Sequence, residues 1–227
     1  LSLGSAVSGS PDDIVSIAAD SAVENGVIVV VASGNSGPSA STIGNPGAAR
    51  NVITVGAYCK SQDQGVDARC AIPVVNFSSR GPIVFKNSSG IAETYSKPDI
   101  VAYGHKICAA KSNGTVIKGT DCLDANHILL SGTSMASPHI AGAIALIKQG
   151  NPNLTPLEIK QLITSTAQNL NLDKNIAGAG LLNLESAMAQ VVIPSTSVRI
   201  SGLPLYYIYS PKNKLESYSK VLTIFIF

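Results

Sequence analysis

A run of six apolar residues at positions 27–32, Val-Ile-Val-Val-Val-Ala, constrains the fold more than any other stretch. A strand with no polar position is buried on both faces, which is typical of the centre of a parallel sheet. The run leads straight into a glycine-rich loop at 33–38, and a second apolar strand is expected at 52–57. Six residues are too few to cross a bilayer, so no membrane span is expected.

Helical patterns surround these strands. Ser10 followed by Pro11 and two acids is typical of a helix start, and Asn25-Gly26 is typical of a helix end. This helix is expected to bury one face, made of Ile14, Ile17, Ala18 and Ala22. Further helices are predicted at 134–150, with a stripe of Ile140, Ala143, Ile144 and Ile147, at 155–167 behind a capping box, and at about 181–191. The polar segment 86–96 is predicted to be a surface loop. The pattern indicates an α/β fold, a mostly parallel sheet flanked by helices in three layers.

Residues 131–139, Ser-Gly-Thr-Ser-Met-Ala-Ser-Pro-His, join an apolar run to the longest predicted helix. A serine at a helix start is most often an N-cap. A tight turn at this place can also present a hydroxyl as a nucleophile, with the unpaired N–H groups of the first helical turn beside it. Local physical chemistry does not separate these two roles for Ser134.

The whole stretch resembles the nucleophile motif of the subtilases, the subtilisin-like serine peptidases. The resemblance implies a subtilisin-like fold, Ser134 as the catalytic nucleophile and Asn35 as a donor to the oxyanion. It covers residues 1–192, which correspond to the C-terminal two-thirds of a subtilase catalytic domain. Residues 193–227 are predicted to be a linker and the start of a β-rich appendage. The family usually has Pro where this chain has Tyr103, a departure expected to alter a turn.

The same resemblance implies a site for a polypeptide substrate. Ser2, Leu3 and Gly4 would pair with the extended substrate, although a plain strand end explains them too. Ala32, Ser33 and Gly34 would form small, uncharged walls of the pocket for the side chain before the scissile bond. Gly44 would lie at its bottom, or would simply permit a turn. A preference for large apolar or aromatic side chains follows.

The acid and the base of the family are missing from this sequence. The Asp and His motifs of subtilases precede the serine motif, and neither occurs here. His105 is predicted to be a loop residue and His127 a structural one, while the spacing of His139 turns it away from Ser134. We therefore expect serine endopeptidase activity to require an upstream part of the same domain, and the chain alone to be inactive. The alternative is a non-catalytic peptide-binding module; a nucleotide-binding domain is third, since no phosphate loop is present.

Net charge and cysteine content bear on the partners and the location of the protein. The formal net charge of +2, without a basic run, gives no indication of nucleic-acid binding. Four cysteines, Cys59, Cys70, Cys108 and Cys122, are expected to pair as 59–70 and 108–122 because each pair closes a short polar loop. Four free buried thiols are the alternative. Secretion is a family-level expectation that disulfides would support. No cofactor is needed for the chemistry, but subtilases often hold a structural cation, such as calcium, on the loop that is here 47–52.

Overall fold

The computed structural model describes residues 1–87, 89–112 and 120–191. In chain order the elements are α1 (Ile14–Glu24), β1 (Val30–Ala32), β2 (Ile53–Tyr58), the 3₁₀ turns η1 (Ser61–Asp63) and η2 (Ala68–Cys70), β3 (Ile83–Lys86), β4 (Ala92–Tyr95), β5 (Ile100–Tyr103), β6 (Ile107–Ala110), β7 (Thr120–Asp121), β8 (His127–Leu130), α2 (Thr133–Gly150), α3 (Pro156–Ser165), α4 (Lys174–Ala177) and α5 (Leu184–Ala189). The predicted linker and appendage at 193–227 lie outside the described residues.

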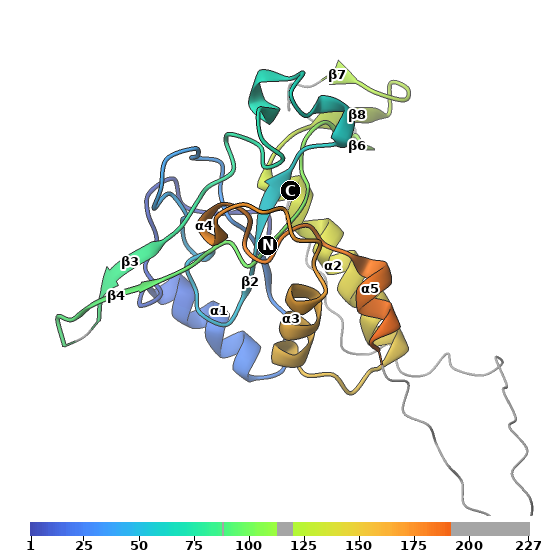
Figure 1. Ribbon diagram of the computed structural model, residues 1–227. Coiled ribbons are helices and arrows are strands. Elements are labelled where there is room, and N and C mark those ends of the chain that lie inside the picture. The colour runs from blue at the N-terminus through green and yellow to red at the C-terminus, as the bar shows by residue number, and fades with distance from the viewer. Residues whose placement is uncertain (88, 113–119, 192–227) are drawn as a thin grey trace, which may run out of the picture.

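The centre of the molecule is a parallel sheet of three strands in the order β1-β2-β5. Val30 of β1 pairs with Ile53 of β2, and Val55 of β2 pairs with Ile100 of β5. All residues of β1 and β2 are buried, as the unbroken apolar runs predict. Figure 1 shows α1 on one side of β2 and α2, α3 and α5 on the other, so the predicted three-layer α/β architecture is confirmed.

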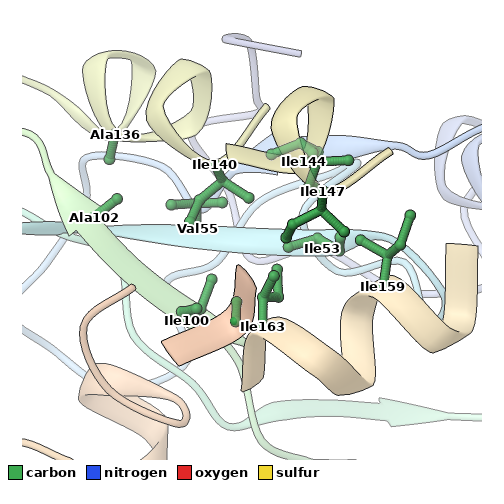
Figure 2. Packing of buried hydrophobic residues seen from close by; sticks show 12 residues of the cluster. Ile53, Val55, Ile100, Ala102, Ala136, Ile140, Ile144, Ile147, Ile159 and Ile163 are labelled. Atoms are coloured by element: carbon green, nitrogen blue, oxygen red, sulfur yellow. The ribbon is translucent and has the colours of Figure 1, made fainter. Parts of the chain in front are cut away.

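An aliphatic layer joins the sheet to α2 and α3. It consists of Val30, Ile53, Val55, Ile100, Ala102, Ala136, Ile140, Ile144, Ile147, Ile159, Ile163 and Ala187. Figure 2 shows the isoleucines of α2 gathered over Val55 and Ile53, with the two isoleucines of α3 in the same cluster. Burying an isoleucine of this kind contributes about 1.5–3 kcal/mol. The predicted stripe on α2 is correct, and the capping box of α3, Thr155 with Glu158, is confirmed.

The predicted buried face of α1 is wrong. Ile14 is 80% exposed and Ile17 is 50% exposed, and Ala18 is exposed as well, whereas Ser16, Ala19 and Asp20 are buried. The helix is oriented by polar contacts: the Asp20 carboxylate accepts backbone N–H groups at 2.7 and 2.9 Å from the segment before β2. The N-cap is Asp13 instead of Ser10, because its side chain accepts from the Val15 N–H group at 2.9 Å.

Two antiparallel units stand outside the central sheet. The segment predicted as a loop at 86–96 instead contributes to the hairpin β3–β4, where Ile83 and Phe85 alternate with exposed residues and pack on Ile43 and Ala48. The other unit is the sheet β6-β8-β7. Both predicted disulfides, Cys59–Cys70 and Cys108–Cys122, are present, which settles the pairing against free thiols.

Tyr103, the departure from the family pattern, is the last residue of β5. Its ring lies edge-on against Tyr58, with centroids 5.4 Å apart, and also near the His139 ring. In the described ranges, no helix is both long and apolar enough to pass through a bilayer.

Candidate active site

Ser134 lies in the first turn of α2, one residue inside the helix. The N-cap is Gly132, which provides no side-chain cap, so the reading of Ser134 as an N-cap is wrong. The Ser134 hydroxyl donates to the Ser2 carbonyl oxygen at 3.3 Å, and the side chain is only partly buried. The Thr133 N–H group donates to Asn35 and the Met135 N–H group donates to the Gly132 carbonyl. The Ser134 N–H group lies between them in the first turn, where N–H groups have no partner within the helix.

Asn35 follows β1 and reaches the same turn. Its Oδ1 accepts from the Thr133 backbone N–H at 3.0 Å and from the Thr133 hydroxyl at 3.1 Å. Both bonds use the amide oxygen, so they leave the two N–H donors of Asn35 Nδ2 unused. The Nδ2 atom lies close to Gly132. Gly34 has a φ of +104°, a conformation that favours glycine. A Cβ at this position would in addition come too close to the Ser79 hydroxyl.

The predicted substrate edge lies beside Ser134. The Ser2 hydroxyl donates to the Ser134 carbonyl at 3.0 Å, and Ser2, Leu3 and Gly4 are all exposed. Leu1 continues the central sheet, because its carbonyl accepts from the Ala32 N–H group at 3.0 Å. The structure thus brings the segment at 2–4 next to the Ser134 turn.

The predicted pocket residues occupy two neighbouring segments. Ala32 and Ser33 are buried at the end of β1, and among the described residues the Ser33 hydroxyl has no hydrogen-bond partner. Gly44 is buried against the segment at 4–5: a Cβ on it would overlap the Ser5 carbonyl oxygen. The Ser5 N–H group donates to the Asn45 carbonyl at 2.9 Å, which fixes that approach. A side chain at position 44 is therefore excluded by the backbone itself.

None of the three histidines of the sequence forms a hydrogen bond with Ser134. His139 Nδ1 lies 2.8 Å from the Met135 carbonyl oxygen. His127, the first residue of β8, has its Nδ1 2.8 Å from Asp124 Oδ1 in the bend before that strand. In the described residues, Ser134 and Asn35 thus reach the same helix turn without a histidine bonded to Ser134.

His105 has more contacts than a loop residue was expected to have. It is fully buried, its Nε2 lies 3.1 Å from Asp67 Oδ2, and its Nδ1 lies 3.3 Å from the Ser131 hydroxyl. Ser131 also accepts from the Lys106 N–H group at 2.9 Å, and the Gly132 N–H group donates to Gly104. The turn before α2 is therefore held by the turn between β5 and β6. Sequence reasoning missed this network because its members are far apart in the chain.

The Asp67 carboxylate is well stabilised. Hydrogen bonds from the Arg69 backbone, the Arg69 side chain and Lys106 hold the pKa of Asp67 far below its usual range. Lys106 donates hydrogen bonds to both Asp63 and Asp67, and these bonds raise the pKa of Lys106. Asp67 lies inside the loop closed by the Cys59–Cys70 disulfide, so that loop is tied to the turn that carries Ser134.

The described residues hold no cluster of three or more His, Cys, Asp or Glu side chains that could bind a metal. Any cation on the loop at 47–52 would depend on backbone carbonyls, whose contacts are described below.

Comparisons with known proteins identify related chains. The chain is 39% identical to the serine protease AprX of Bacillus subtilis over 175 residues, which are 75% of this chain and 37% of that protein. It is 35% identical to subtilisin BL of Lederbergia lenta over 187 residues, 82% of this chain and 54% of that one. The chain therefore spans about half the length of these relatives or less.

Solved structures give the same result for the fold. A protease of Pseudoalteromonas arctica PAMC 21717 superposes with a TM-score of 0.60 at 27% identity, covering 85% of this chain and 50% of the other. The prenylagaramide maturation protease PagA has a TM-score of 0.60 at 26% identity, covering 85% and 61%. A family model described as the subtilase family matches residues 1–180. With this match over most of its length, the chain belongs to the subtilase family.

Proposed function

We propose that this chain is the part of a serine endopeptidase catalytic domain that carries the nucleophile and the oxyanion hole. Ser134 Oγ attacks the carbonyl carbon of a peptide bond while a base takes its proton and passes it to the nitrogen; the C–N bond breaks and the amine leaves. Water then hydrolyses the acyl-enzyme, which releases the carboxylic acid and restores the Ser134 hydroxyl. The Asn35 Nδ2 group and the Ser134 backbone N–H hold the negative charge that develops on the carbonyl oxygen.

The observation that carries this proposal is the pair of hydrogen bonds from Thr133 to Asn35 Oδ1, at 3.0 and 3.1 Å. They engage the amide oxygen of Asn35, which supports the proposal that the amide nitrogen is the group that donates to the oxyanion. A neutral donor held in place in this way stabilises the transition state without binding the ground state strongly.

The base and its orienting Asp are proposed to come from an upstream part of the same domain. The described residues supply no histidine to Ser134. Leu1 extends the sheet beside β1, and α1 exposes Ile14, Val15 and Ile17 at 80%, 49% and 50%. An exposed apolar face of this kind is a surface against which further protein packs.

The proposed substrate is a polypeptide. Leu3 and Gly4 expose their backbone beside Ser134, and an exposed backbone edge of this kind accepts an extended chain as an added strand. We propose a preference for large apolar or aromatic side chains before the cleaved bond, in a pocket formed by Ala32, Ser33, Gly34 and Gly44. Secretion is proposed from the family and from the two disulfides.

Labelling with a fluorophosphonate tests the proposal. We expect the full-length protein to be labelled and to hydrolyse peptides, and the chain of residues 1–227 to do neither. Ser134→Ala should abolish both activities, while Ser165→Ala, an exposed serine on α3, should leave them unchanged. Rapid labelling of the chain alone would show that no upstream base is needed.

Asn35→Ala measures the oxyanion hole separately. Loss of one such donor in a subtilisin lowers kcat by about 10²–10³-fold, and we expect the same range here with little change in KM. An unchanged kcat in this variant would remove Asn35 from the reaction.

A peptide-binding module without turnover is the second candidate, because no base contacts Ser134 in the described residues. It predicts that the full-length protein binds peptides but is not labelled. Labelling of the full-length protein decides between the two.

A further inference from the structure

The loop at 47–52, between the Gly44 segment and β2, is where subtilases often hold a metal cation on backbone carbonyls. In this chain four of the six loop carbonyls, those of Gly47, Ala48, Arg50 and Val52, already accept hydrogen bonds from side chains. The Gly47 carbonyl accepts from the Thr54 hydroxyl at 2.7 Å, and the Ala48 carbonyl accepts from the Tyr95 hydroxyl. The Arg50 carbonyl accepts from Lys160 Nζ at 3.2 Å. The loop therefore does not present a free set of carbonyl ligands.

The Val52 carbonyl oxygen accepts hydrogen bonds from two lysine ammonium groups. Lys160 Nζ lies 2.8 Å from it and Lys97 Nζ lies 3.1 Å from it. Lys97 is 1% exposed, and the Lys160 side chain is 18% exposed. Positive charge thus already occupies the position from which a metal would contact this oxygen.

The carboxylate that Lys160 contacts, Asp99, is also engaged. Asp99 Oδ2 lies 2.7 Å from Lys97 Nζ and accepts from the Thr54 N–H group at 2.7 Å, while Asp99 Oδ1 lies 3.0 Å from Lys160 Nζ. The nearby Asp20 carboxylate is turned to the N–H groups of Arg50 and Asn51. Both oxygens of Asp99 thus already face an ammonium group, and a further cation placed there would be repelled by the two lysines.

We propose that the Lys160 ammonium is the built-in cation of this loop, and that the loop therefore binds no metal ion. Lys160 contacts two carbonyls and one carboxylate oxygen, the kind of oxygen ligand set that a hard cation takes. It also ties α3 to the segment that leads from Gly44 into β2. The inference concerns the stability of this loop and does not depend on the proposed peptidase activity.

Hydrogen exchange of the full-length protein, followed by mass spectrometry on peptides covering 44–54, provides a local test. In the wild type, exchange in this segment should be the same with Ca²⁺, with Na⁺ and after treatment with EDTA. In Lys160→Met, which keeps an unbranched side chain but loses the charge, exchange should be faster and should slow again when Na⁺ or Ca²⁺ is added.

Lys148→Met is the matched control. Lys148 is also partly buried and also donates to two backbone carbonyls, Pro152 and Leu154, but away from the loop. It should leave exchange at 44–54 unchanged and unresponsive to cations. Slower exchange in the wild type on adding either cation would overturn the proposal, and this measurement needs no variant to fold. Faster exchange in Lys160→Met that neither cation reverses would also overturn the proposal. Lys160 would then hold the loop by its hydrogen bonds without occupying a position that a metal ion can take.

Discussion

The aliphatic layer between the central sheet and α2 is closed by side chains without a polar atom, whereas the edge at which β2 and β5 begin is closed by charges. We call this second region the charged edge; it consists of Asp20, Lys97, Asp99 and Lys160. The aliphatic layer is stabilised by removing surface from water, a contribution that does not depend on pH. The charged edge depends on every charge keeping its partner.

The largest effect on stability is expected when the charged edge loses its shared carboxylate. Asp99→Ala leaves two ammonium groups, one of them fully buried, without a counter-ion. Breaking a buried pair in this way costs about 3–5 kcal/mol, which denaturant unfolding of the full-length protein would measure. Asp121→Ala, whose ion pair with Lys111 is exposed, should cost at most about 1 kcal/mol. Equal losses in the two variants would contradict the distinction between buried and exposed charge.

Ile147→Ala tests the aliphatic layer. Ile147 is fully buried, so its truncation leaves a cavity and should cost about 2–5 kcal/mol. In the chain of residues 1–227, Ile17→Ala on the exposed side of α1 should change the free energy of unfolding by less than about 0.5 kcal/mol. If the upstream part packs on α1, the same Ile17→Ala change should cost clearly more in the full-length protein. The comparison of Ile17→Ala in the two proteins therefore tests that packing.

The sequence predicted the aliphatic packing better than the polar contacts. The stripe of Ile140, Ile144 and Ile147 was predicted because aliphatic burial leaves a period in the sequence. The orientation of α1 was predicted wrongly because Asp20, a polar residue, fixes it by accepting two backbone N–H groups. Periodicity counts apolar residues and does not register such contacts.

The active-site elements show a similar contrast. The motif at 131–139 and the loop after β1 singled out Ser134 and Asn35, and the structure brings these two segments together; their catalytic roles stay predictions. The contacts of His105 with Asp67 and Ser131 were not predicted, because they join three loops that no local pattern connects. Long-range polar contacts were thus the part that only the structure revealed.

The pH dependence of the free energy of unfolding should also distinguish the charged edge from the aliphatic layer, with a smaller effect than the substitutions above. Burial lowers the pKa of Lys97 to about 8, with Lys160 lowering it and Asp99 raising it. The folded protein then releases this proton at a lower pH than the unfolded chain does, so the lysine opposes folding below pH 8, and stability rises between about pH 8 and 10.5. The rise should be at most about 3 kcal/mol. Lys97→Met should lack this rise, while Ile147→Ala should retain it; an identical pH profile for wild type and Lys97→Met would contradict the shift.

The smallest expected effect is at the start of α3, the helix that carries Lys160. Thr155→Ala removes the capping box in which the Thr155 hydroxyl and the Glu158 carboxylate satisfy each other's backbone N–H groups. The expected cost is about 1 kcal/mol in the free energy of unfolding, measured by thermal or denaturant unfolding. Thr155→Ser keeps the hydroxyl and should recover most of the loss; failure to recover would show that the threonine methyl group, not the cap, is responsible.

The contact of Lys160 with the loop at 47–52 also bears on how the protein responds to its surroundings. A bound metal stabilises a protein by an amount that depends on its free concentration, so dilution or a competing chelator weakens it. An ammonium group carried by the chain is present at one equivalent per molecule in every solution. On this assignment, the order of the segment leading from Gly44 into β2 is independent of the supply of ions outside the protein.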